Sequence, residues 1–67
     1  MTYVEAFELV QAGQGRWTVQ NRATATIAAR VLRTHAGFEL RDVRDGALGS
    51  FDSIEDGLRF LLRTARR

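Results

Sequence analysis

The stretch from Leu48 to Leu62 (Leu-Gly-Ser-Phe-Asp-Ser-Ile-Glu-Asp-Gly-Leu-Arg-Phe-Leu-Leu) most constrains what this chain can fold into. A short apolar run ends at Asp52-Ser53, and Ser53 can cap a following helix, with Asp56 three residues later in the capping-box position. Beyond this point the apolar residues recur at the spacing of one helical face, at Ile54, Leu58, Leu61, Leu62 and Ala65. We therefore expect a strand that leads directly into an amphipathic C-terminal helix.

Two residues of this helix lie outside the apolar stripe. Gly57 is next to it, and a glycine inside a helix costs about 1 kcal/mol relative to alanine. We expect Gly57 to permit close contact between the helix and a sheet. Phe60 falls roughly opposite the stripe, so the pattern predicts that it is an exposed aromatic residue.

Before the helix the apolar residues recur every second position, which is typical of half-buried antiparallel strands. This alternation is clear over residues 16–20, 27–32 and 38–41. Turn-forming residues separate the runs at Gly13-Gln14-Gly15, Asn21 to Thr24, His35-Ala36-Gly37 and Asp45-Gly46. These connections are too short for parallel crossovers. The sequence predicts one small α+β domain over residues 1–67, an antiparallel meander of four to five strands with one C-terminal helix on one face.

Residues 2–11 fit two structures. Thr2 and Glu5 have capping-box spacing, and apolar residues follow at helical intervals. The same segment can instead form a strand that hairpins into Trp17, with Tyr3, Phe7 and Leu9 on its inner face. The Gly13-Gln14-Gly15 turn close behind favours the strand.

Composition limits the classes of function. The 67 residues include no cysteine, which excludes disulfides and thiolate metal sites, and no apolar run is long enough to span a bilayer. No signal peptide is visible, so we expect a cytoplasmic protein. All ten basic residues are arginine, which suits phosphate binding; the alternative explanation is codon bias in a GC-rich genome. The net charge is only +2, and no segment forms a basic block.

Two motifs resemble a known family. Leu48-Gly49-Ser50-Phe51-Asp52-Ser53, followed by Glu55-Asp56, is similar to the last strand and helix start of AP2-like DNA-binding domains. These are the plant AP2/ERF factors and the arm-binding domains of phage integrases. Glu39-Leu40-Arg41-Asp42 is similar to the family's middle strand, whose outward Glu and Arg touch DNA. The resemblance covers residues 29–65 and implies a three-stranded sheet with one packed helix, with Glu39 and Arg41 as DNA-contacting positions.

No arrangement of residues indicates catalysis. His35 is the only histidine and lies in a predicted turn, with nothing near it in sequence to orient it or to supply a nucleophile. Asp42 and Asp45 flank a turn and are better interpreted as turn formers than as metal ligands. We expect no enzyme activity, no catalytic residues, no metal, no cofactor and no small-molecule substrate.

The two faces of the predicted sheet differ in composition. The inward set is Tyr3, Phe7, Leu9, Trp17, Val19, Ile27, Val31, Phe38, Leu40 and Phe51. The outward set is Val4, Ala6, Val10, Arg16, Thr18, Gln20, Ala28, Arg30, Leu32, Glu39, Arg41 and Val43. The outward set contains more apolar residues than a solvated face requires, and apolar patches tend to be contact sites; scattered surface apolar residues are also normal. A cross-strand pair of Glu39 with Arg30 or Arg41 is expected.

These observations predict a non-enzymatic binding or regulatory module that acts through the open face of its sheet. Its partner is a protein or a second copy in a homodimer, with no membrane partner. The predicted contact residues are Val4, Val10, Leu32, Val43 and Phe60. The alternative is an AP2-like nucleic-acid-binding domain that uses Arg30, Arg33, Glu39 and Arg41.

Overall fold

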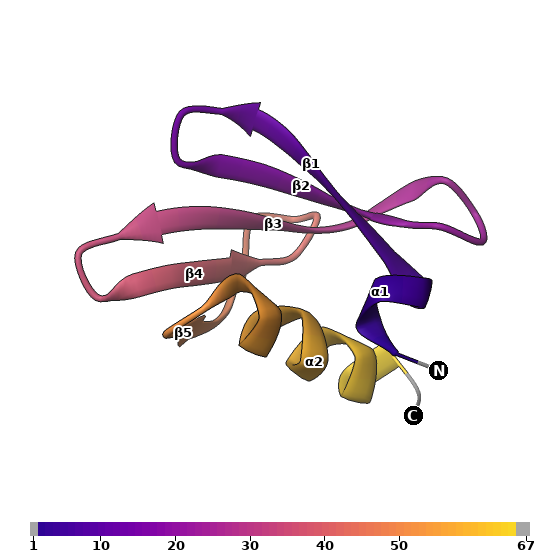
Figure 1. Cartoon of the computed structure of the whole chain (residues 1–67). Helices are drawn as coiled ribbons and strands as arrows, with labels where there is room; N and C mark the ends of the chain where they lie inside the picture. Colours follow the sequence, from indigo (N-terminus) through magenta and orange to yellow (C-terminus); the bar gives the residue numbers. More distant parts are fainter. Residues whose placement is uncertain (1, 66–67) are drawn as a thin grey trace.

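Five antiparallel strands form one sheet in the computed structural model, which describes residues 2–65 (Figure 1). The elements are α1 (Tyr3–Ala6), β1 (Phe7–Gly13), β2 (Arg16–Asn21), β3 (Thr26–Thr34), β4 (Gly37–Arg41), β5 (Ala47–Phe51) and α2 (Ile54–Ala65). The strand order is β1-β2-β3-β4-β5, so every strand pairs with its neighbour in sequence. The predicted α+β meander with a C-terminal helix is confirmed.

The N-terminal segment combines both predicted structures. A single helical turn, α1, precedes β1, and the carboxylate of Glu5 accepts hydrogen bonds from Thr2 N at 3.0 Å and Thr2 Oγ1 at 3.1 Å. These bonds, led by the backbone one, lower the pKa of Glu5. The chain then becomes extended at Phe7, which is buried in the core. Tyr3 is half-buried and packs against that core from α1.

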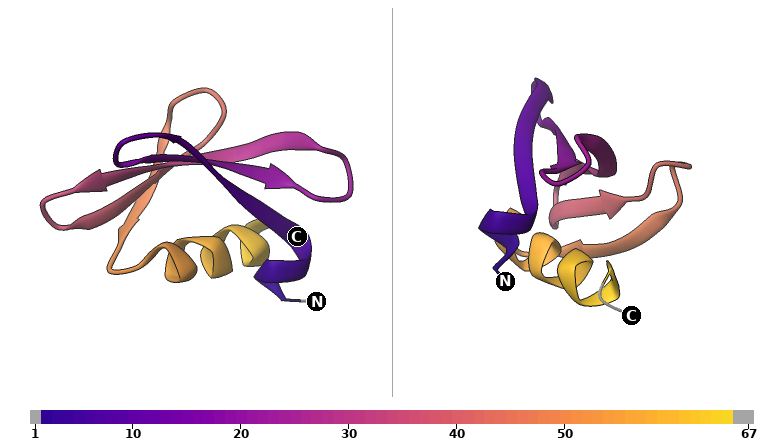
Figure 2. Two further views of the ribbon diagram at one scale, coloured as in Figure 1. Left: turned by 45° about the horizontal axis from the view of Figure 1, so that its top comes forward. Right: turned by 90° about the vertical axis from the view of Figure 1, so that its right-hand side faces the viewer.

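The start of α2 follows the sequence prediction in part. Ser53 Oγ accepts a hydrogen bond from Asp56 N at 3.2 Å, as expected of an N-cap. The Asp56 carboxylate accepts instead from Arg59 Nη1 at 3.1 Å, so among the described hydrogen bonds it does not complete the capping box. Both helices lie on the same side of the sheet, and α2 packs against α1, β4 and β5 (Figure 2).

The core lies between α2 and the sheet. Its buried apolar residues are Phe7, Val19, Ala29, Val31, Leu40, Leu58 and Leu61. Gly57 is buried, and a Cβ there would lie 3.3 Å from Cδ2 of Phe51, which confirms the predicted close contact between helix and sheet. The prediction for Phe60 is wrong. Its ring is half-buried, with its centroid 5.5 Å from that of Phe51, because Phe51 extends beneath the helix toward it.

A bulge in β3 reverses the predicted direction of Ile27. Val19 pairs with Ala29, but Gln20 pairs with Ile27, so Ala28 is an extra residue without a partner in β2. Beyond the bulge the alternation is shifted by one residue. Ile27 therefore lies on the face opposite the core and is 45% exposed, while Ala29 is buried. Ala28, predicted to face outward, packs against the core instead, as does Ala6.

Leu9 lies on the predicted face of the sheet, but its burial is incomplete. It lies on the inner face opposite Val19, but it is 38% exposed. The reason is that α2 packs against the β4–β5 side of the sheet, and the β1–β2 hairpin extends away from it (Figure 1). Sequence alternation identified the correct face of Leu9 but not how far the helix reaches across that face.

Candidate interaction surface

The face of the sheet opposite the helices is here called the outer face. The strand register assigns to it alternate residues of each strand: Glu8, Val10, Arg16, Thr18, Gln20, Ile27, Arg30, Leu32, Glu39, Arg41 and Ser50. Neither α1 nor α2 covers this face (Figure 2). The outer face is therefore a sheet surface against which neither helix packs.

Apolar side chains on the outer face come from three places along the strands. Val10 on β1 lies opposite Thr18, Ile27 on β3 lies opposite Gln20, and Leu32 on β3 lies opposite Arg16. Val10 is 39% exposed, and Leu32 is half-buried. The three apolar residues thus surround the polar residues of β2 rather than forming one uninterrupted patch.

A shallow hollow of about 220 Å³ lies on this face between Leu32 and β1. Ala12, Arg16, Thr18, Arg30 and Leu32 are among its lining residues. The hollow combines small and aliphatic side chains with two guanidinium groups. The β1 bulge at Ala12, between the pairs Gln11–Trp17 and Gly13–Arg16, borders it.

Arg41, on the outer face, forms ion pairs with two carboxylates. Its Nε donates to Glu39 Oε1 at 2.9 Å, and its Nη1 lies 3.3 Å from Asp45 Oδ1. The hydrogen bond to Glu39, followed by the negative charges of Glu39 and Asp45, raises the pKa of Arg41. The ion pair runs along one strand rather than across strands as predicted, because Glu39 faces Leu32 and Ser50.

Arg30 lies directly opposite Arg41 on the neighbouring strand. Within residues 2–65 the ion pairs are Arg41–Glu39, Arg41–Asp45 and Arg59–Asp56, so neither Arg30 nor Arg16 belongs to one. Like charges that face each other across a ladder are destabilising, and here the carboxylates around Arg41 offset the repulsion.

The structure separates the predicted contact residues. Val10 and Leu32 share the outer face. Val4 is exposed on α1, Val43 is exposed in the turn between β4 and β5, and Phe60 lies on α2 and packs against the core. These five residues therefore do not form one surface. Ile27 is the outer-face residue that sequence reasoning missed, and no sequence signal marks the bulge that exposes it.

The predicted nucleic-acid residues are also divided. Arg30, Glu39 and Arg41 lie on the outer face, but Arg33 pairs with Phe38 on the opposite face. Residues three apart on a regular strand point to opposite sides, so Arg30 and Arg33 cannot contact the same ligand surface.

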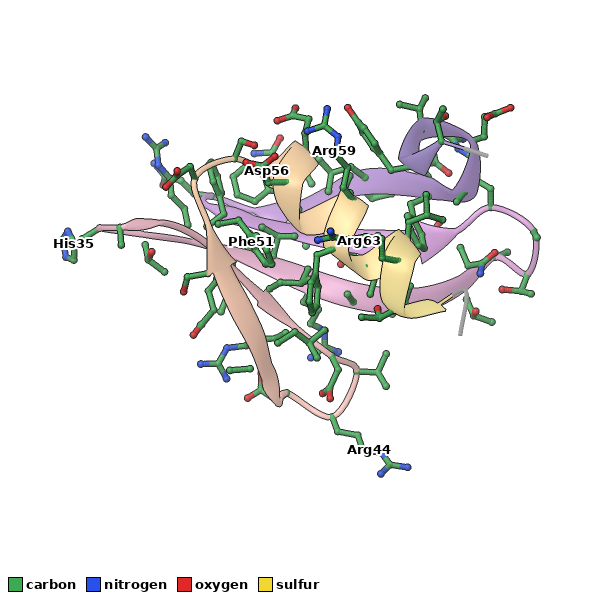
Figure 3. All side chains as sticks on the ribbon, turned by 90° about the horizontal axis from the view of Figure 1, so that it is seen from below. His35, Arg44, Phe51, Asp56, Arg59 and Arg63 are labelled. Carbon is green, nitrogen blue, oxygen red and sulfur yellow. The ribbon has the colours of Figure 1, made fainter. Side chains whose placement is uncertain are left out.

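A second depression, about 650 Å³ and open to solvent, lies where the end of β5 meets α2. Its lining includes Phe51 and the charged residues Asp56, Arg59 and Arg63, which Figure 3 shows along the helix. Arg59 is already bound to Asp56, and its guanidinium carbon lies 5.3 Å from the ring centroid of Tyr3. The charges of this rim are mixed and partly paired, so it carries no clear preference for a ligand.

His35 occupies the tip of the β3–β4 hairpin, as predicted, and projects away from the domain (Figure 3). Within the described part of the chain, no three His, Cys, Asp or Glu side chains are grouped as metal ligands would be. No helix in residues 2–65 has the length and apolar character required to cross a bilayer.

Comparisons with known families, curated proteins and solved structures found no match. The resemblance to AP2-like domains therefore stays a prediction from the motifs alone.

Proposed function

We propose that this domain is a non-enzymatic protein-binding module that acts through its outer face. The observation that carries the proposal is the position of Val10, Ile27 and Leu32 on a sheet face that neither helix covers. Val10 and Ile27 are exposed there and Leu32 is half-buried, and apolar side chains that stay in contact with solvent on one sheet face are typical of contact sites for other proteins.

The balance of charge on this face supports a protein ligand. Arg41 is neutralised by Glu39 and Asp45, and the polar residues of β2, Thr18 and Gln20, lie between the apolar ones. Such a mixture of apolar anchors and polar surroundings is the usual composition of a non-obligate protein interface. The partner is a different protein or a second copy of the chain.

A photo-crosslinking residue in place of Leu32 tests the proposal in the source cell. It should capture one predominant protein, while the same residue in place of Val43, exposed but off the sheet, should not. The captured protein is then purified and its affinity for the wild type and Leu32→Glu is measured by calorimetry. We expect at least about a tenfold loss of affinity, the usual effect of removing a central apolar contact.

Val43→Glu is the matched control, since it introduces the same charge at an exposed valine in the β4–β5 turn. It should leave the affinity unchanged. Equal affinities of the wild type, Leu32→Glu and Ile27→Glu for the captured protein would show that the outer face is not the binding surface.

Nucleic acid is a second candidate ligand, favoured by one observation. Arg16 and Arg30 both line the outer-face hollow and belong to none of the ion pairs within residues 2–65. Guanidinium groups without a carboxylate partner suit phosphate oxygens.

This candidate predicts binding to random duplex DNA that weakens steeply with added salt. Arg30→Gln should weaken the binding and reduce the salt dependence by about one unit of log–log slope. Arg33→Gln, on the opposite face, should leave both unchanged. A salt-independent signal, or equal effects of the two substitutions, would remove this candidate.

A further inference from the structure

The strand β1 is the longer of the two free edges of the sheet. The order β1-β2-β3-β4-β5 leaves one side of β1 and one side of β5 unpaired. The strand β5 has five residues, contains a bulge at Leu48 and lies beside α2. The strand β1 has seven residues, and every residue from Glu8 to Ala12 is exposed. A long exposed edge strand is a template for pairing with another strand.

At two residues of β1 the backbone N–H and C=O groups point toward the free edge of the sheet. Arg22 N donates to Ala6 O at 2.9 Å, which makes Phe7 and Asn21 a pair without direct hydrogen bonds. The alternation of an antiparallel ladder then turns the N–H and C=O of Leu9 and Gln11 away from β2. The same groups of Phe7 are already occupied: its N–H donates to Tyr3 O, and its C=O accepts from Arg22 Nε at 3.2 Å.

We propose that β1 pairs with β1 of a second copy, antiparallel about a two-fold axis at Val10, so that the two five-stranded sheets form one continuous sheet. This rests on the proposed function as a binding module and names the second copy as one partner. Leu9 of each copy then lies opposite Gln11 of the other, and these two residues satisfy each other's open N–H and C=O groups. A register centred on Leu9 would instead bring Gln11 to Phe7, whose backbone groups are occupied.

The side chains fit this register. Val10 contacts Val10 of the second copy on the outer face. Leu9, which α2 leaves exposed on the inner face, becomes more buried in the dimer. Glu8 lies opposite Ala12 of the other copy, and Arg16 is close by, since its Nε lies only 3.4 Å from where a Cβ on Gly13 would be. Within residues 2–65 neither Glu8 nor Arg16 has an ion-pair partner, so the dimer provides two complementary charge pairs.

A single introduced cysteine tests the register, because the native chain has none. In a pair without direct hydrogen bonds the facing Cβ atoms are about 4.5–5.5 Å apart, near the separation of about 3.5–4.5 Å in a disulfide. Val10→Cys should therefore give a covalent dimer of twice the 7.5 kDa mass under mild oxidation. Leu9→Cys should not form the covalent dimer, because its counterpart is displaced by two residues along the strand. No dimer from Val10→Cys, or equal cross-linking of both variants, would overturn the proposal.

Proline at Gln11 tests the edge itself. The N–H of Gln11 points away from β2. Gln11→Pro therefore removes a hydrogen-bond donor of the proposed dimer without removing a hydrogen bond between β1 and β2. Light scattering at high micromolar concentration should give a dimer for the wild type and for Gln11→Ala, and a monomer for Gln11→Pro. Far-ultraviolet circular dichroism should confirm that the proline variant is folded. A monomeric wild type, or a dimeric proline variant, would contradict edge pairing.

These outcomes are independent of the outer-face proposal. Leu32→Glu should remain dimeric, because Leu32 lies on β3, away from the β1 edge. If Leu32→Glu keeps full affinity for the captured protein but remains dimeric, the outer-face proposal fails and edge pairing stands. If Gln11→Pro remains dimeric while Leu32→Glu loses the captured protein, edge pairing fails and the outer-face proposal stands.

Discussion

The carbonyl oxygen of Phe51 occupies the space that a side chain on Gly37 would need. Gly37 begins β4 and has φ of +135°, a conformation that favours glycine. Gly37→Ala therefore combines backbone strain with a clash against main-chain atoms of β5. We expect a loss of about 2 kcal/mol or more in the free energy of unfolding. Urea denaturation followed by tryptophan fluorescence measures it.

Ala36→Gly is the control for this prediction. It makes the same turn more flexible without placing any atom near Phe51, and Ala36 is exposed. Its effect should stay within about 1 kcal/mol. Equal destabilisation by the two substitutions would show that turn flexibility, rather than the contact with Phe51, determines stability here.

Much of the fold follows from local patterns. The change from a period of two to a helical period at Ser53 located α2, and short glycine-containing turns required an antiparallel meander. The features that the sequence did not predict depend in each case on another element of the fold. The bulge at Ala28 exposes Ile27, and the reach of α2 leaves Leu9 uncovered.

The candidate site was less predictable than the fold. Alternation placed Val10 and Leu32 on one face, but it gave no information on which exposed residues elsewhere join them. Val4 and Val43 lie off the sheet, and the Phe51 ring accounts for the burial of Phe60. Which exposed residues lie together on one surface depends on how the elements pack. A single sequence indicates such proximity only between residues of the same helix or strand.

A strained turn residue offers a stabilising substitution. Ala25, before β3, has φ of +58°, a left-handed conformation that is unfavourable for alanine. Ala25→Gly should raise the free energy of unfolding by about 0.5–1 kcal/mol, since glycine adopts this conformation without steric cost. Ala23→Gly, in the same turn but without a positive φ, should lower stability slightly. A lower urea midpoint for Ala25→Gly would contradict the prediction.

The first helical turn should depend on pH through Glu5. Its hydrogen bonds from Thr2 require the ionised carboxylate, and they lower its pKa. The contribution to α1 is therefore complete above the ordinary pKa of 4.5 and is lost as the pH falls through the lowered folded-state pKa. Carboxyl chemical shifts in nuclear magnetic resonance titrations should show Glu5 titrating below the ordinary glutamate pKa of 4.5.

Glu5→Gln separates charge from hydrogen bonding at this turn. The amide keeps an acceptor for Thr2 but does not titrate, so the amide shifts of Ala6 should become independent of pH in this range. A Glu5 carboxyl that titrates at or above pH 4.5 in the wild type would contradict the assignment of these hydrogen bonds.

The facing pair Arg30 and Arg41 predicts a charge-reversal effect. Arg30→Glu removes a cation whose repulsion from Arg41 is already offset, and it adds a third carboxylate beside Glu39 and Asp45, which neutralise Arg41. We expect a lower melting temperature at low ionic strength, with a loss that decreases as salt is added. Arg33 faces Phe38 on the other side of the sheet, so Arg33→Glu should show no such loss. A salt-independent change, or the same change in both variants, would contradict the pairing.

Phe60 distinguishes the packed helix from the helix expected from sequence. Its ring contacts Phe51, which also packs on Gly57, so Phe60→Ala leaves a space where three residues meet. Because the ring is only half-buried, we expect a loss of about 2 kcal/mol, below the 3–5 kcal/mol typical of a fully buried phenylalanine. Arg63→Ala, exposed on the same helix, should change the stability by less than about 0.5 kcal/mol. If the two variants unfold at the same urea concentration, Phe60 is a surface residue and the contact between α2 and β5 is looser than the ring geometry indicates.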